Sequence, residues 1–303
     1  MNHPPAICDY EGSTYQEDFW GRGGRTYEDF CEAAALRRLL PPKGGDLLLE
    51  LGAGAGRNTP RYLGFERIVL LDYSRSQLLQ ARERLGVGPR YTYVAANIYH
   101  LPFVPAVFEV ATMIRTLHHL SDPPAALRQV REVMRSGGIF VLEFANKRNL
   151  KAVARYLFRH QSWNPFSLEA VEFAPLNFDF HPAAVRRWLQ ESGFLLERQV
   201  TVSHFRQEWL KRSIPPHVLS RLDGWAGFTG DLWQLTPSVF TRSRAVGGIE
   251  PGASESLFRC PQCGDQHLEQ VKRAGNATAL ACRGCGRQYA LREGIYDFRE
   301  PVG

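Results

Sequence analysis

The chain has 303 residues, a formal net charge of +6 and a pI near 9.1, and 44% of its residues are hydrophobic, as in an ordinary globular protein. No apolar stretch reaches the ~20 residues that span a bilayer, and residues 1–10 lack the basic and apolar regions of a signal peptide, so we expect a cytoplasmic protein. The mild positive charge permits an acidic partner such as RNA without requiring one, and a solvated arginine-rich surface is the simpler explanation.

Strand and helix signals alternate from residue 46 onward. Continuous apolar runs are typical of strands buried on both faces of a parallel sheet, and they occur at 46–51, 68–72, 91–97, 108–114 and 139–144. Two further strands are expected at 194–202 and 239–245. Together these runs predict an α/β fold with a doubly wound, mostly parallel, seven-stranded sheet of the Rossmann-like kind.

Helix signals separate these strands. Ser74 and Gln77 match a capping box that opens a helix extending to about Leu85. Residues 121–124 open a second helix, with an apolar stripe through 127–134, and Gly137-Gly138 is expected to end it. A third helix is expected over 183–192.

Two segments depart from this alternation. Residues 146–179 are rich in aromatic side chains and too long for a plain connection, which predicts a helical insertion over the active face of the sheet. Residues 247–255 are rich in glycine and small residues, which predicts a linker.

A glycine loop follows the first strand. Gly52, Gly54 and Gly56 form G-x-G-x-G, and Arg57 stands where a dinucleotide-binding loop would need its third glycine. The loop still exposes backbone N–H groups that suit a carboxylate, and S-adenosylmethionine (SAM) carries a carboxylate and no phosphate. Asp72 ends the second strand, where it can accept both ribose hydroxyl hydrogens. The sequence therefore predicts a SAM pocket.

Four cysteines near the C-terminus form two C-x-x-C pairs. Eighteen residues separate the pair Cys260/Cys263 from the pair Cys282/Cys285, a spacing typical of a zinc site. Four thiolates make a closed, structural tetrahedron, with iron in a rubredoxin-like site as the alternative. We expect the metal to hold residues 256–303 together, because so short a segment builds little core of its own.

Five motifs over about residues 46–145 resemble class I SAM-dependent methyltransferases, in particular the methyltransferase type 11-like group that modifies quinones and small molecules. In chain order they are Glu50–Gly56, Asp72-Tyr73-Ser74, Ala96-Asn97-Ile98 with Leu101-Pro102-Phe103, Thr116–Leu120 and Arg135–Gly138. The resemblance implies a set of cofactor-binding residues: Tyr15, Arg25, Glu50, Gly52, Gly54, Gly56, Arg57, Asp72, Tyr73, Asn97, Ile98 and Arg115.

Within this set the resemblance implies different roles. Glu50 would anchor the methionine amine, and Arg25 or Arg57 would meet the carboxylate. Asn97 stands where the family usually has an aspartate facing the adenine amino group, and its amide oxygen can accept the same hydrogen bond. Ile98 would pack on the adenine face.

The resemblance also bears on the N-terminus and on catalysis. Residues 1–45 would form a helical lid over the cofactor, with Tyr15, Trp20, Arg25 and Tyr27, or a helix docked by its aromatic rings. His118 and His119 are candidate general bases or loop histidines bonded to nearby backbone. Methyl transfer from a sulfonium often needs little more than in-line alignment, since orientation alone can contribute about 7–11 kcal/mol.

Residues 288–298 resemble small zinc-ribbon proteins that partner and activate certain RNA and translation-factor methyltransferases, here fused in one chain. The expected organisation is a lid (1–45), a methyltransferase domain (46–246), a linker (247–255) and a zinc ribbon (256–303). The expected activity is methyl transfer from SAM to an O, N or C nucleophile of a small-molecule acceptor. The alternatives are an RNA or protein methyltransferase that recruits its substrate through the ribbon, and a non-catalytic binding module.

Overall fold

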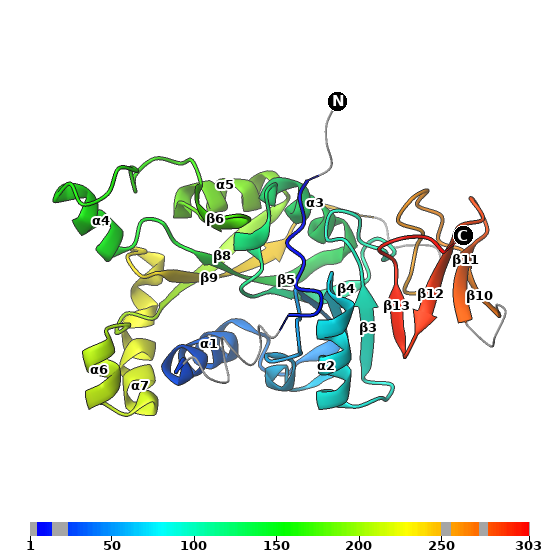
Figure 1. The fold of residues 1–303 in the computed structure, drawn as a ribbon, viewed down its shortest axis with the longest axis horizontal. Helices are drawn as coiled ribbons and strands as arrows, with labels where there is room; N and C mark the ends of the chain where they lie inside the picture. The colour runs from blue at the N-terminus through cyan, green and yellow to red at the C-terminus, as the bar shows by residue number, and fades with distance from the viewer. Residues whose placement is uncertain (1–4, 14–23, 250–255, 273–277, 303) are drawn as a thin grey trace.

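The computed structural model describes residues 5–13, 24–249, 256–272 and 278–302. Within these residues, no helix combines the length and apolar character needed to cross a membrane. One continuous sheet runs along the long axis of the molecule (Figure 1) and contains eleven strands in the order β10-β11-β12-β13-β3-β2-β1-β4-β5-β9-β8.

The seven strands from β3 to β8 in this order make up the predicted doubly wound sheet. Strands β1 to β5 pair in parallel, and β9 runs antiparallel to both β5 and β8. The chain winds outward from β1 in both directions, so the crevice between the carboxyl ends of β1 and β4 is where such sheets bind ligands. The strands are β1 (Gly45–Leu51), β2 (Phe65–Asp72), β3 (Tyr91–Ala95), β4 (Phe108–Met113), β5 (Met134–Ala145), β8 (Phe194–Val202) and β9 (Ser238–Ala245).

Helices cover both faces of this sheet. The side chains of α1 (Thr26–Leu39) and α2 (Arg75–Leu85) pack on one face, and those of α3 (Pro123–Val133) and α5 (Pro182–Glu191) on the other. The predicted caps are present: the Ser74 hydroxyl accepts the Gln77 N–H, and Asp122 accepts the Ala125 N–H. The capping box is only half formed, because the Ser74 N–H donates to Asp72 instead of to the Gln77 side chain, whose amide group donates to the Ser13 carbonyl.

The end of α3 differs from the expectation. The helix stops at Val133, and Gly137-Gly138 lie inside β5. Gly137 has φ +80°, and the pairing of β4 with β5 shifts register between Phe108 and Val110. A Cβ on Gly138 would lie 2.9 Å from the Glu109 carbonyl oxygen. The two glycines therefore form a bulge rather than a helix end, since glycine serves both geometries.

The insertion at 146–179 is helical only in its first part. It contains α4 (Leu150–Leu157), followed by a hairpin of β6 (Val171–Ala174) and β7 (Asn177–Asp179). A second insertion that the sequence analysis did not predict lies between β8 and β9. It contains α6 (Glu208–Ser213), α7 (Pro216–Ala226) and a 3₁₀ turn, η4 (Gly227–Asp231).

The C-terminal segment is joined to the methyltransferase sheet. Its strands β10 (Leu268–Lys272), β11 (Thr278–Cys282), β12 (Gln288–Arg292) and β13 (Ile295–Asp297) are antiparallel to one another. Strand β13 then pairs in parallel with β3, with Ile295 opposite Tyr93. Phe258 stacks on Phe103 with ring centroids 5.9 Å apart. The predicted ribbon thus covers the β3 edge and shares its core with the larger sheet.

Candidate cofactor pocket and metal site

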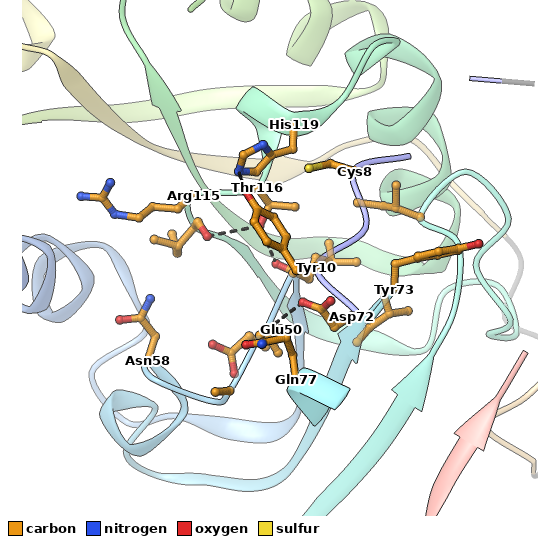
Figure 2. A pocket seen from close by; sticks show the side chains of 18 of the residues that line it. Cys8, Tyr10, Glu50, Asn58, Asp72, Tyr73, Gln77, Arg115, Thr116 and His119 are labelled. Carbon is orange, nitrogen blue, oxygen red and sulfur yellow. Dashed lines mark hydrogen bonds between the residues drawn. The ribbon is translucent and has the colours of Figure 1, made fainter. Parts of the chain in front are cut away.

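A pocket lies at the carboxyl ends of β1, β2 and β4, where the winding of the sheet places a ligand site (Figure 2). Each part of its wall comes from a different stretch of the chain. Its lining includes Ile7, Cys8 and Tyr10 from the N-terminal segment, Glu50, Gly52, Gly54 and Arg57 around the glycine loop, Asp72, Tyr73 and Ile98 from the second and third strand ends, and Arg115, Thr116 and His119 after β4.

The three loop glycines have different surroundings, and all have positive φ. A Cβ on Gly52 would lie 2.0 Å from the Thr116 hydroxyl oxygen, so no side chain fits there. A Cβ on Gly54 would meet nothing within 4 Å, which leaves open space for a ligand. Gly56 packs on α2, where a Cβ would lie 2.9 Å from Leu85, and it is not part of the described lining.

Asp72 faces the glycine loop from the end of β2. One carboxylate oxygen accepts the Gly54 N–H at 2.8 Å, and the other accepts the Ser74 N–H at 2.9 Å. Burial raises the pKa of Asp72 above its ordinary value. Each oxygen keeps lone-pair capacity for a further donor, so the carboxylate is placed to receive hydroxyl groups of a ligand.

Glu50 also lines the pocket and is 4% exposed. Its oxygens accept hydrogen bonds from the Thr59 hydroxyl at 2.6 Å and the Tyr62 hydroxyl at 3.1 Å. Burial raises the pKa of Glu50 to about 7, despite these two donors. The carboxyl group is therefore poised between its neutral and charged forms near neutral pH.

The two arginines of the pocket are tied to α1. Arg57 pairs with Asp29 and with Glu32, and Arg115 also pairs with Glu32. Glu32 is 2% exposed, and its pKa is lowered because the two guanidinium charges outweigh its desolvation. Sequence reasoning missed Asp29 and Glu32, because their partners lie beyond the first strand and no local pattern marks the pairing.

Among the described residues of the predicted lid, the segment 5–13, which is neither helix nor strand, is the part that lines the pocket. Tyr27 of α1 is 1% exposed and donates to Asp223 of α7, away from the described lining. Arg25 stands at the N-cap of α1, also outside that lining. Tyr15 and Trp20 lie outside the described residues. The segment that reaches the pocket carries Tyr10, which no helix or strand pattern singled out.

Hydrogen bonds at both ring nitrogens fix the orientation of His119. Its Nδ1 lies 3.0 Å from the Leu176 carbonyl oxygen, which can only accept, so Nδ1 carries the proton. Its Nε2 lies 3.1 Å from the Tyr10 hydroxyl and accepts that hydrogen (Figure 2). Burial holds the pKa of His119 below its ordinary value of 6.5. The imidazole is thus held in its neutral form, with its basic nitrogen engaged by the Tyr10 hydroxyl at the edge of the pocket.

His118 and Asn97 lie outside the described lining, although their neighbours belong to it. The His118 ring contacts the His119 ring at a tilt of 45°, with ring centroids 4.0 Å apart, and burial holds the pKa of His118 well below 6.5. The Asn97 amide oxygen accepts the Tyr99 N–H at 2.9 Å and so closes a turn. Ile98, by contrast, is part of the pocket lining.

The four cysteines of the C-terminal segment converge. Their sulfur atoms all lie within 4.8 Å of one another, with Cys260 3.7 Å from Cys285 and Cys263 3.5 Å from Cys282. A tetrahedron with metal–sulfur bonds of ~2.3 Å has sulfur atoms ~3.8 Å apart, so the cluster fits one metal ion. Gly264 and Gly286 have φ +79° and +73° and turn the chain after each pair.

Comparison with known proteins decides the family. A family model described as a methyltransferase domain matches residues 49–142. The chain is 31% identical over 194 residues to the ubiquinone/menaquinone biosynthesis C-methyltransferase UbiE of Xylella fastidiosa (strain M12), covering 61% of this chain and 67% of the relative. The chain belongs to the class I SAM-dependent methyltransferases. This methyltransferase is also 28% identical over 138 residues to the 27-O-demethylrifamycin SV methyltransferase of Amycolatopsis mediterranei, over 43% of this chain and 51% of that one.

Solved structures share the fold at low sequence identity. A complex of the Haloferax volcanii Trm112 methyltransferase activator with a methyltransferase matches with a TM-score of 0.52 and 15% identity, over 76% of this chain and 97% of that one. The [4+2]-cyclase SpnF matches with a TM-score of 0.51 and 17% identity, over 72% of this chain and 82% of that one. These likenesses confirm the predicted methyltransferase fold.

Proposed function

We propose that this methyltransferase transfers the methyl group of SAM to a carbon nucleophile of a small, hydroxyl-bearing molecule. The observation that carries the proposal is the meeting of two features in one pocket: the open glycine loop with Asp72, and the basic nitrogen of His119. Several of the similar relatives are named C-methyltransferases, which favours carbon over oxygen or nitrogen.

The pocket residues divide into two groups. Gly52 and Gly54 leave room for the methionine part of SAM, Asp72 receives the ribose hydroxyls, and Glu50 faces the methionine ammonium. When bound, SAM supplies an electrophilic methyl group. Once the acceptor hydroxyl takes the place of the Tyr10 hydroxyl at Nε2, His119 removes its proton and so makes the acceptor carbon nucleophilic. That carbon then takes the methyl group as the methyl–sulfur bond breaks, SAH leaves, and the carbon releases its own proton.

The contacts of the C-terminal ribbon favour a role in supporting the cofactor pocket over a role in recruiting substrate. Arg299 follows β13 and donates to the Glu11 carboxylate at 3.3 Å and to the Tyr73 carbonyl at 3.4 Å. Glu11 in turn accepts the N–H groups of Arg75 and Ser76 at the start of α2. The ribbon thereby clamps the segment that crosses the pocket. We infer that the four cysteines hold zinc and that this metal maintains the clamp.

The cofactor assignment is tested by titration calorimetry with S-adenosylhomocysteine (SAH). We expect Asp72→Ala to weaken SAH binding by about 1.5–3 kcal/mol, because it deletes a charged acceptor. Asp72→Asn keeps the shape but turns its NH2 group toward one of the two backbone N–H donors, so it should also weaken SAH binding. Unchanged SAH affinity in Asp72→Ala would remove Asp72 from the site, and preference for a dinucleotide over SAH would overturn the cofactor assignment.

The acceptor class is tested by transfer of labelled methyl groups to phenolic and quinol compounds, alongside RNA and protein fractions. Product analysis then distinguishes a carbon–methyl bond from an oxygen–methyl bond, because only the latter is cleaved by strong acid. Transfer only to RNA or protein would favour the alternative in which the ribbon recruits a macromolecule.

A further inference from the structure

The two insertions bring many exposed apolar side chains to one end of the molecule. We define the apolar face by six of them: Leu157, Phe158, Trp225, Phe228, Leu232 and Trp233. Each is more than half exposed, with Trp225 at 79% and Leu232 at 78%. So many bare aromatic and aliphatic side chains in two short segments mark an interaction site rather than scattered surface residues.

The two insertions adjoin each other. The Leu150 N–H at the start of α4 donates to the Leu235 carbonyl at 2.8 Å, and the Asn146 amide donates to the carbonyls of Gln234 and Thr236. In Figure 1, α4, α6 and α7 lie at the left end of the molecule, and the C-terminal strands β10–β13 lie at the right end. The apolar face is therefore remote from the ribbon.

Helix α4 has the character of a surface-binding helix. Of its residues only Ala152 is buried. Exposed Leu157 and the following Phe158 alternate with exposed Lys151, Arg155 and Arg159. The sequence from 147 to 168 contains five lysines and arginines and no acidic residue. Amphipathic helices of this composition are typical of lipid interfaces, because their apolar side chains insert at the boundary of the acyl chains and their cations contact the headgroups.

The second insertion repeats the exposed aromatic side chains but not the charge excess: it has four basic residues, Arg206, Lys211, Arg212 and Arg221, against three acidic ones, Glu208, Asp223 and Asp231. Trp209, Trp225 and Trp233 are all exposed, and tryptophan is favoured at the membrane–water boundary. Exposed Arg212 and Arg221 accompany them. A second copy of this chain fits the face poorly, because the same basic residues would oppose one another across the contact. Anionic headgroups complement them.

We propose that the apolar face docks the methyltransferase peripherally on an anionic phospholipid membrane. The side chains of the face enter the interface, and Lys151, Arg155 and Arg159 contact the headgroups. This inference goes beyond the proposed function, and its test requires no methyl transfer.

The test is co-sedimentation of the full chain with vesicles of phosphatidylcholine, with and without phosphatidylglycerol. We expect binding to the phosphatidylglycerol vesicles, with a blue shift of tryptophan fluorescence. We also expect weaker binding as salt rises, because the Debye length falls from about 10 Å at 0.1 M to about 3 Å at 1 M.

Two variants separate the apolar contribution from the charge. Phe158→Ser/Trp225→Ser should lower vesicle affinity at least tenfold, because it removes two large inserting side chains. Lys151→Glu/Arg155→Glu should abolish the preference for phosphatidylglycerol. Leu63→Ser is the matched control: Leu63 is 72% exposed but lies between η2 (Thr59–Arg61) and β2, outside the face. SAH affinity checks that every variant is folded.

Either of two results would overturn the proposal in the vesicle assay or in solution. In the vesicle assay it is absence of binding to phosphatidylglycerol vesicles at low salt. Binding that the face variants and the Leu63 control lower equally counts as the same failure, because the apolar face then makes no specific contribution. The second result is a dimer in sedimentation equilibrium that Phe158→Ser/Trp225→Ser dissociates, which would make a second copy the occupant of the face.

Discussion

At the residue scale, the pocket holds two titratable groups, Glu50 and His119, and burial favours the neutral form of each. Glu50 has its pKa raised to about 7 by burial, and His119 has its pKa lowered below 6.5 by burial. The carboxyl group is thereby partly neutral near pH 7, and burial favours the neutral form of the imidazole. Each group is expected to report its proposed role through a distinct pH dependence.

For Glu50 the expected signal is in cofactor affinity. A ligand ammonium favours the ionised carboxylate, and the ionised fraction rises as pH passes 7. SAH affinity should therefore fall about tenfold between pH 8 and pH 6, since the carboxyl must release a proton to bind. Calorimetry across this range tests the expectation, with Glu50→Gln as the control that lacks the pH dependence. Equal slopes in both proteins would contradict the assignment.

For His119 the expected signal is in turnover. His119→Asn should lower kcat by 10²–10⁴-fold, the usual contribution of a general base, while SAH affinity stays near wild type. In the wild type at saturating SAM, where the Glu50 effect on binding no longer contributes, kcat should fall as acid protonates His119, because the neutral imidazole is the active form and its pKa lies below 6.5. Tyr10→Phe keeps the ring and removes the hydroxyl, so it should have a smaller effect. Full turnover by His119→Asn would show that alignment alone drives the reaction.

At the element scale, β13 does more than extend the sheet. Its pairing with β3 brings Arg299 over the Tyr73 ring, 5.8 Å from the ring centroid, and onto Glu11. These contacts link a C-terminal strand with the N-terminal segment that crosses the pocket. The strand pairing therefore couples the ribbon to the cofactor site through a small number of side chains.

Arg299→Ala should raise the SAH dissociation constant about five- to tenfold, because charge-assisted hydrogen bonds to the crossing segment are lost. Arg292→Ala is the matched control, since Arg292 is an exposed arginine of neighbouring β12. Hydrogen exchange of residues 5–13 should rise in the first variant only. Identical SAH affinity in both would show that the clamp does not support the pocket.

At the scale of the whole molecule, the metal site and the methyltransferase sheet belong to one core. Buried side chains from both parts, including Phe103 and Phe258, belong to the same cluster. Structural zinc contributes about 10–16 kcal/mol to the folding of comparable modules. Loss of the metal should therefore lower the stability of the methyltransferase sheet as well as that of the ribbon.

We expect elemental analysis to find one zinc per chain, and Cys282→Ser to lose it. Chelation should lower the Tm of the full chain and weaken SAH binding, because β13 and Arg299 lose their support. Restoring zinc should recover both properties in the wild type and not in Cys282→Ser. Unaltered SAH binding after complete chelation would mean that the β3 edge holds β13 without the metal.

Local sequence patterns predicted most of the strands of the methyltransferase sheet. Buried parallel strands are continuous apolar runs, so all seven strands were predictable within a few residues, as were the caps at Ser74 and Asp122. Gly137-Gly138 was misassigned because a glycine pair marks both helix ends and bulges. The hairpin β6–β7 and the helices α6 and α7 were missed because aromatic-rich insertions carry no regular period.

By itself the sequence determined the class of fold, the glycine loop, Asp72 and the four cysteines, because glycine freedom, strand ends and C-x-x-C spacing are local constraints. Only the tertiary structure decided that residues 5–13 cross the pocket, that Asp29 and Glu32 hold its arginines, and that β13 completes the sheet beside β3. These pairings join residues tens to hundreds of positions apart. These pairings are stabilised by burial and charge pairing between distant segments, so the pattern of any single segment does not predict them.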